Sequence, residues 1–116
     1  MVVGTTSHAG KSMLVTALCR IIRRQNLRVV PFKGQNMALN SYVTATGAEM
    51  GYAQAVQSWA AGLVPNVAMN PILLKPQGNM TSQVILKGKP LATLKATEYY
   101  EKFFDTGWDT FTKCLD

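Results

Sequence analysis

Apolar residues recur along this chain at spacings that separate helices from strands. From Met13 to Ile22 they lie three and four residues apart, which predicts a helix with one apolar face that ends at Gln25-Asn26. A short apolar run at 1–3 precedes this helix, and another at 28–32 follows it. A strand, a helix and a strand within about thirty residues form a βαβ unit, in which the two strands are parallel.

A second helix is predicted between residues 46 and 61. Thr46 and Glu49 have the spacing of a capping box at its start, and Gly62 follows as its stop. Its apolar stripe is expected to face the core: Tyr52, Val56 and Trp59.

The remainder of the chain predicts two strands and a last helix. Apolar runs at 71–76 and 82–86 indicate strands, and the segment 87–90 indicates a turn. Thr97 is expected to begin a helix whose apolar stripe faces the core: Tyr100, Phe104, Trp108, Phe111 and Leu115. Together these elements predict an α/β fold with a mostly parallel sheet flanked by helices.

Composition narrows the class of protein. The chain has 116 residues, 47% of them hydrophobic, which suits one globular domain. No apolar run is long enough to span a membrane, and no secretory signal opens the chain. Cys19 and Cys114 have no metal-binding spacing, so we expect reduced thiols and a cytoplasmic location.

The charge is uneven, because residues 1–95 contain ten lysines and arginines but one acid, Glu49. The bases are scattered and have no aromatic residues between them, so we expect neither nucleic acid nor a membrane as partner. An anionic small molecule suits the positive excess better. The shortage of carboxylates also leads us to expect the acidic ligand of any metal beyond residue 116.

One motif carries more chemistry than the rest of the chain. It lies between the first apolar run and the first helix, and it comprises Gly4, Thr5, Thr6, Ser7, His8, Ala9, Gly10, Lys11 and Ser12. A glycine-bounded loop that ends in Gly-Lys-Ser at a helix start is typical of a phosphate-binding loop, or P-loop. Lys11 is expected to contact the β- and γ-phosphates, and the Ser12 hydroxyl to ligate Mg²⁺. The first glycine lies one position earlier than in the common pattern, and an ordinary surface turn is the alternative reading.

Several stretches beside this loop point to one family. The Gly-x5-Gly-Lys-Ser spacing resembles the dethiobiotin-synthetase-like P-loop ATPases, and the polar string at 31–44 closely resembles the cobyric acid synthase family. So do the stretches at 49–54, 69–76 and 82–85. The resemblance therefore covers nearly the whole chain.

The resemblance implies an ATP-dependent amide ligase of cobalamin biosynthesis. ATP would phosphorylate side-chain carboxylates of adenosylcobyrinic acid a,c-diamide, and ammonia from glutamine would displace the phosphate to give adenosylcobyric acid. Lys33 matches the family's second lysine and would act with Lys11 as a catalytic residue; a surface lysine is the alternative. Four residues would bind the corrinoid carboxylate or amide, unless they only form turns: Gln35, Asn36, Asn40 and Ser41. Gln54 and Lys75 are weaker candidates.

The resemblance also implies that part of the enzyme is missing. Residues 1–116 would form the N-terminal part of the ATP-binding synthetase domain, and the C-terminal glutaminase domain would be absent. Cys19 and Cys114 do not lie in a nucleophile turn, so we expect this chain to be inactive alone. A partial sheet leaves an uncovered apolar edge, so we also expect the chain to be only marginally stable. Asn79 and Tyr52 depart from the family pattern, which affects the details of substrate binding rather than ATP use.

Three alternatives remain at this stage. The first is another dethiobiotin-synthetase-like carboxylate ligase, such as cobyrinic acid a,c-diamide synthase. The second is a ParA- or MinD-like ATPase switch, although Thr5 and Thr6 stand where those proteins have an extra lysine. The third is a remnant without catalytic activity.

Overall fold

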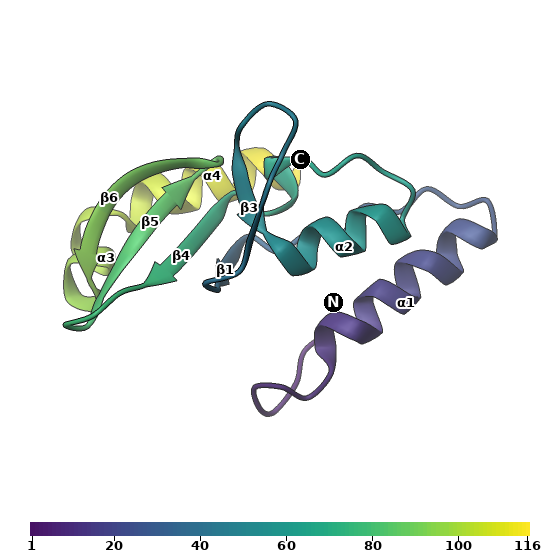
Figure 1. The fold of residues 1–116 in the computed structure, drawn as a ribbon, viewed down its shortest axis with the longest axis horizontal. Coiled ribbons are helices and arrows are strands. Elements are labelled where there is room, and N and C mark those ends of the chain that lie inside the picture. Colours follow the sequence, from purple (N-terminus) through teal and green to yellow (C-terminus); the bar gives the residue numbers. More distant parts are fainter.

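The computed structural model describes all of residues 1–116 as two sheets and a set of flanking helices (Figure 1). The main sheet has four strands in the order β1 (Gln35–Met37), β4 (Ile72–Pro76), β5 (Thr81–Leu86) and β6 (Lys89–Lys95). β1 and β4 are parallel, whereas β4, β5 and β6 are joined by short turns and are antiparallel. The predicted α/β class is confirmed, although the sheet is mixed rather than mostly parallel.

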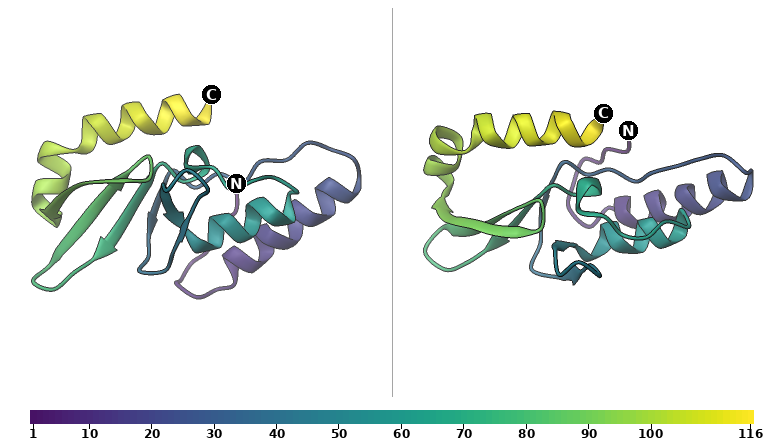
Figure 2. Two further views of the ribbon diagram at one scale, coloured as in Figure 1. Left: turned by 45° about the horizontal axis from the view of Figure 1, so that its top comes forward. Right: turned by 90° about the horizontal axis from the view of Figure 1, so that it is seen from above.

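A small hairpin and the helices complete the fold. β2 (Ser41–Val43) and β3 (Glu49–Gly51) form an antiparallel pair. α1 (Lys11–Arg24) and α2 (Tyr52–Ala60) lie side by side beyond the β1 edge of the main sheet (Figure 1), and the 3-10 turn Val67–Met69 leads into β4. α3 (Ala96–Lys102) and α4 (Phe104–Leu115) follow β6, and α4 lies over one face of the sheet (Figure 2). None of the helices combines the length and the apolar composition that crossing a bilayer requires.

The predicted strands at 1–3 and 28–32 do not form in this structure. Neither segment belongs to a sheet, so the predicted βαβ unit around α1 is wrong: no strand precedes α1, and the parallel pair β1–β4 has α2 between its strands instead. Parallel pairing begins later, where the Lys33 amide donates to the Met69 carbonyl at 2.9 Å and the Ile72 amide donates to the Gly34 carbonyl at 3.1 Å. A central parallel strand needs ladder partners, and no strand of the structure lies beside 1–3 or 28–32.

The predicted capping box at Thr46 is also wrong. Glu49 lies in β3, opposite Val43, and α2 begins only at Tyr52 with Gly51 as its N-cap. The Thr44 hydroxyl instead accepts from the Ala48 amide at 3.2 Å and closes the β2–β3 turn. The C-terminal end was predicted correctly, because Gly62 takes a left-handed φ of +72° directly after the helix.

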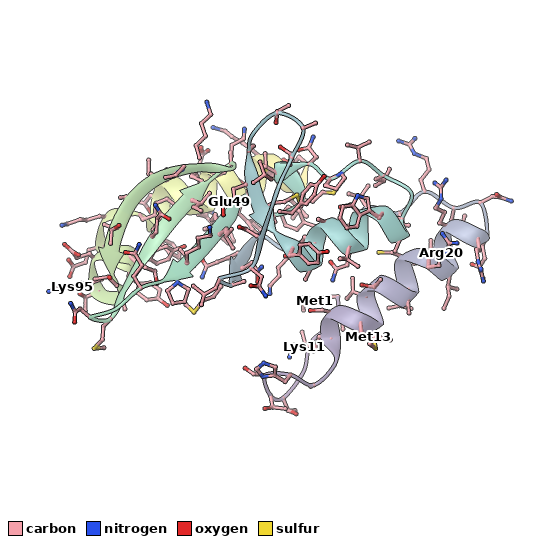
Figure 3. The ribbon with its side chains drawn as sticks, viewed as in Figure 1. Met1, Lys11, Met13, Arg20, Glu49 and Lys95 are labelled. Atoms are coloured by element: carbon pink, nitrogen blue, oxygen red, sulfur yellow. The ribbon has the colours of Figure 1, made fainter.

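The apolar stripes of the helices do not face the core as predicted. On α4 most of the stripe is exposed, with Phe104 and Trp108 more than half exposed, although Phe111 packs against Phe32. The buried residues of α4 and its N-cap are instead Phe103, Gly107 and Thr110. Phe103 packs with Ile72, Leu74 and Val84 in the hydrophobic core. On α1 the exposed apolar residues include Met13, which Figure 3 shows on the free side of the helix.

The second helix shows the same reversal. On α2, Tyr52 and Trp59 are 49% and 44% exposed, and the polar Gln54 and Gln57 are buried instead. The buried face of α2 is therefore amide-rich, and its side chains bond to Asn36 on β1, to the Ser12 carbonyl at the start of α1 and to Met69.

Candidate functional site

The loop at residues 4–10 presents a bare helix terminus. Gly10 is the N-cap of α1 and has φ of +80°, and His8 has φ of +59°. No side chain caps α1, and its first turn contains no acidic residue. The free N–H groups and the positive end of the helix dipole are therefore available to an anion.

Lys11 is folded back across this loop. Its Nζ donates to the carbonyl of Thr6 at 2.6 Å, and a Cβ on Gly4 would lie 3.0 Å from Lys11 Cδ. Glycine at position 4 thus leaves room for the lysine stem. The ammonium lies at the mouth of the loop, beside the start of α1 (Figure 3), where it can exchange a carbonyl oxygen for a phosphate oxygen.

The loop shares a cleft with the segment that follows Phe32. This cleft, which we call the Lys11–Lys33 cleft, has a volume of about 450 Å³ and no acidic residue lines it. Its lining comes from the loop, from 33–40 and from the start of α2: Ser7, His8, Lys11, Ser12, Lys33, Asn36, Met37, Ala38, Asn40, Tyr52 and Ala53. A second hollow of about 360 Å³ is lined by residues 8–13 of the loop and helix. Two stretches that the sequence singled out separately thus meet at one site.

The two lysines of the cleft are close enough to influence each other. Partial burial, and then repulsion from the Lys11 ammonium, lower the pKa of Lys33. Lys33 Nζ donates to Asn36 Oδ1 at 2.7 Å, and no carboxylate pairs with it. An anion between the two lysines would offset their repulsion, so the cleft is electrostatically suited to a polyphosphate.

Buried amides support the cleft from behind. Asn36 Nδ2 donates to Gln54 Oε1 at 3.0 Å, and Asn70 Oδ1 accepts from the Gly51 amide at 2.9 Å. Asn70 Nδ2 also donates to the Lys33 carbonyl at 2.9 Å, which fixes the backbone from which Lys33 projects.

The first turn of α1 is hydrogen-bonded to α2, the helix that also contains Gln54. Gln57 Nε2 on α2 donates to the Ser12 carbonyl at 3.3 Å. The sequence did not identify Gln57, Gly51 or Asn70 as residues of the site. Gly51 and Asn70 lie in the stretches 49–54 and 69–76 that resemble the family, but nothing local assigned them a role, and Gln57 had no signal beyond its position in a predicted helix.

The four residues expected to bind the acceptor carboxylate do not all lie together. Asn36 and Asn40 line the Lys11–Lys33 cleft, and the Asn40 side chain makes no hydrogen bond to the protein. Gln35 lies on the opposite face of β1, where its Oε1 accepts from the Tyr99 hydroxyl at 2.6 Å. The Ser41 hydroxyl donates to the Glu49 carboxylate, outside the cleft.

The Glu49 carboxylate is committed to other groups. It forms an ion pair with Lys75, and it accepts from Ser41. Burial alone would raise the pKa of Glu49, but the hydrogen bonds from Lys75 and Ser41 outweigh it, so the pKa lies below its ordinary value. Lys75, a weaker candidate from the sequence, thus holds β3 to β4 in this structure and does not line the cleft.

This pairing predicts a loss of stability in acid. The pKa of Glu49 is lower in the folded chain than in the unfolded chain, so its ionised carboxylate stabilises the fold at pH values above the unfolded-state pKa. This stabilisation is lost as the pH falls through the pKa of the folded state. Between about pH 5 and pH 3, the free energy of unfolding should fall less in Glu49→Gln than in the unchanged chain. Urea unfolding at several pH values measures this difference, and parallel curves for the two proteins would contradict the assignment.

A metal ion would find few ligands in this chain. No group of three histidine, cysteine, aspartate or glutamate side chains lies close enough to hold one. The Ser12 hydroxyl at the start of α1 is a hard oxygen ligand of the kind that Mg²⁺ accepts, and it lines the cleft. The donor set therefore fits a metal that arrives with phosphate oxygens.

Comparison with known proteins shows the family to which the chain is similar. Residues 1–109 match the family model described as the CobQ/CobB/MinD/ParA nucleotide binding domain. The chain is 68% identical, over 99% of its length, to a cobyric acid synthase of Nostoc punctiforme, of which it covers 23%. It is 66% identical over its whole length to a cobyric acid synthase of Trichodesmium erythraeum, of which it covers 24%.

A third relative has a similar identity and coverage. The chain is 69% identical, over 99% of its length, to a cobyric acid synthase of Gloeothece citriformis, of which it covers 23%. It therefore spans about a quarter of the length of the curated relatives it matches, and no solved structure matches it. These relatives confirm the resemblance drawn from the string at 31–44 and from the loop at 4–12.

Proposed function

The chain belongs to the CobQ/CobB/MinD/ParA family of nucleotide-binding domains, and from that premise we propose that it binds ATP for the amidation of a corrinoid. In this proposal the loop at 4–12 binds the phosphates. The γ-phosphoryl group is transferred to a side-chain carboxylate of adenosylcobyrinic acid a,c-diamide. Ammonia from glutamine then attacks the carbon of this acyl phosphate, the carbon–oxygen bond breaks, and inorganic phosphate leaves to give the amide of adenosylcobyric acid.

The observation that carries this proposal is the shared cleft. Phosphoryl transfer to a carboxylate needs an anion site for the nucleotide directly beside a site for a second anion. Lys11, at the start of α1, and Lys33, just before β1, line one cleft without an acidic residue, and Asn40 has a free amide in the same cleft. The cyanobacterial relatives carry the name cobyric acid synthase, which agrees with this chemistry.

Each lysine has a distinct role in this mechanism. Lys11 leaves the Thr6 carbonyl and neutralises charge on the β- and γ-phosphates. Lys33 faces it and stabilises the charge that develops on the transferred group while the carboxylate oxygen attacks phosphorus. Asn40 donates an amide hydrogen to the carboxylate and orients it; the bond between the γ-phosphorus and its bridging oxygen breaks, and ADP leaves.

Mg²⁺ enters this proposal as a companion of the nucleotide. The Ser12 hydroxyl would hold it together with phosphate oxygens and water, and the ion would supply further neutralisation of the phosphates.

We propose that glutamine is hydrolysed outside residues 1–116, which would form the N-terminal part of a synthetase domain. The chain covers about a quarter of its relatives, which leaves room for a glutaminase domain. Within the chain, Cys19 is buried in α1 and burial raises the pKa of its thiol. A thiol of this kind is a poor nucleophile.

A chimera tests the proposed function. This chain replaces the matching quarter of the Nostoc punctiforme cobyric acid synthase, and amidation of the corrinoid is followed with ATP and glutamine. We expect the chimera to be active, and Lys33→Ala to lower the rate about 100-fold while ATP still binds, because one cation that acts on the transferred group is lost. Lys95→Ala, at the far end of β6 (Figure 3), is the matched control and should leave the rate unchanged.

Three results would contradict the proposal. A chimera that folds and binds ATP but does not amidate the corrinoid would exclude this substrate. A Lys33→Ala chimera with the full amidation rate would exclude Lys33 from the transfer step. ATP hydrolysis that needs no corrinoid would favour the ParA- or MinD-like switch instead.

A further inference from the structure

We propose that Asn36 and Gln54 are positioning residues that hold the Lys33 ammonium in the Lys11–Lys33 cleft, and that Asn36 does not itself bind the acceptor. The inference deepens the proposed function, since it depends on a role for Lys33 in the cleft. It replaces the sequence-based expectation that Asn36 contacts the corrinoid.

The hydrogen bonds of the Asn36 side chain carry this inference. The residue is 6% exposed, its Oδ1 accepts from Lys33 Nζ at 2.7 Å, and its Nδ2 donates to Gln54 Oε1 at 3.0 Å. An ammonium only donates, so the amide oxygen of Asn36 must face Lys33 and the amide nitrogen must face α2. Because Asn36 Nδ2 donates, Gln54 must direct its Oε1 toward it, so each of the two side-chain amides has only one possible orientation.

The space around this pair is closed by backbone. A Cβ on Gly51 would lie 2.3 Å from Asn36 Nδ2 and 2.5 Å from Gln54 Oε1. A Cβ at these distances would push the two amides out of their present positions, so glycine at 51 leaves room for their hydrogen bond. Gln54 is 2% exposed, and neither amide can turn toward a ligand without breaking a buried hydrogen bond. The pair is thus built to hold Lys33 in place.

A neutral partner suits this lysine better than a carboxylate would. The ionisable groups that face Lys33 across the cleft are Lys11 on α1, His8 in the loop and Tyr52 on α2, and no carboxylate lines the cleft. An amide oxygen fixes the direction of the ammonium without cancelling its charge, so the charge remains available to a phosphate. A carboxylate at position 36 would pair with Lys33 and repel the nucleotide.

The test measures the titration of Lys33 directly. The 15N resonance of the Lys33 ammonium is followed against pH in the unliganded chain, and ATP affinity is measured by calorimetry over the same pH range. Three variants are compared with the unchanged chain: Asn36→Asp, Asn36→Leu and Gln54→Met. Gln83→Met, on β5 and without a side-chain hydrogen bond, is the control for the last of them.

The variants should move Lys33 in opposite directions. Asn36→Asp should raise the pKa of Lys33 and weaken ATP binding about tenfold at neutral pH, because the ion pair removes a free cation. Asn36→Leu should lower that pKa further, so ATP affinity falls at a lower pH than in the unchanged chain. Gln54→Met, which leaves Asn36 in place, should shift the pKa in the same direction as Asn36→Leu but less, and Gln83→Met should not shift it.

General damage to the fold cannot produce shifts of opposite sign. The proposal is overturned if folded Asn36→Leu and Gln54→Met both titrate as the unchanged chain does, or if Asn36→Asp and Asn36→Leu shift Lys33 in the same direction. The Lys33 titration needs no nucleotide. A chain that does not bind ATP would therefore refute the proposed function, while the titration still decides on Asn36 and Gln54.

Discussion

Lys11→Ala is expected to weaken ATP binding by about 100-fold, which corresponds to about 2.7 kcal/mol. Lys11 and Lys33 are the only lysines or arginines that line the cleft, and Lys11 alone contacts the loop, through the Thr6 carbonyl. The loop amides and Lys33 remain in the variant, so weak binding should persist. Calorimetric titration with ATP in the presence of Mg²⁺ measures the loss.

A control separates this effect from general loss of charge. Lys95→Ala removes the same charge from the end of β6, where the residue is exposed, and it should bind ATP as the unchanged chain does. The thermal unfolding midpoint of Lys11→Ala should stay close to that of the unchanged chain, because the side chain is bonded only to its own loop. An unchanged ATP affinity in Lys11→Ala would remove the assignment of residues 4–12 as a phosphate-binding loop.

Asn70→Ala is expected to lower the free energy of unfolding by about 3 kcal/mol. Asn70 is 1% exposed, and its amide joins three backbone groups, since it accepts from Gly51 and donates to the carbonyls of Lys33 and Ile72. Alanine would leave these buried groups without a partner. Because one of them belongs to Lys33, the variant should also bind ATP more weakly than the unchanged chain.

The chain offers a matched control in Asn66→Ala. Asn66 is exposed, and its side chain caps the 3-10 turn through one bond to the Ala68 amide at 2.9 Å. Its loss should cost only about 0.5–1 kcal/mol. Chemical denaturation compares both variants, and equal losses would show that the Asn70 amide does not hold the segments together.

The local signals of the sequence were sufficient for part of this fold. The spacing from Met13 to Ile22 predicted α1, whose observed end at Arg24 lies next to the predicted stop. The apolar runs at 71–76 and 82–86 predicted β4 and β5 almost to the residue. These predictions succeed because they depend only on the residues within one helix or strand and on the turns at its ends.

The direction in which a helix faces was not predictable in the same way. Periodicity shows that α4 has an apolar stripe, but not whether this structure covers it, and Phe104 and Trp108 are exposed. The buried face of α2 contains Gln54 and Gln57, which no hydropathy pattern assigns to an interior. They are buried because polar groups of other elements meet them: Gln54 accepts from the Asn36 amide on β1, and Gln57 donates to the Ser12 carbonyl on α1.

The candidate site shows the same division. The loop at 4–12 was recognisable because its glycines and lysine have a fixed local spacing, and Lys33 was recognisable from the string around it. The partners of Lys33 were not, since Asn36 meets Gln54 across 18 residues of sequence and Asn70 meets Lys33 across 37. Such contacts depend on how α2 packs against β1, and one sequence contains no direct record of that packing.

The central claim is that the Lys11–Lys33 cleft binds the phosphates of ATP. A rival site exists in the larger hollow of about 550 Å³ near the end of α1, which is lined by four arginines: Arg20, Arg23, Arg24 and Arg28. The most direct test is the 1H–15N spectrum of the uniformly labelled chain during titration with ATP and Mg²⁺. We expect the largest shifts together in the amides of 4–12 and 33–40. Shifts confined to residues 20–30, or absent from 33–40, would contradict the account.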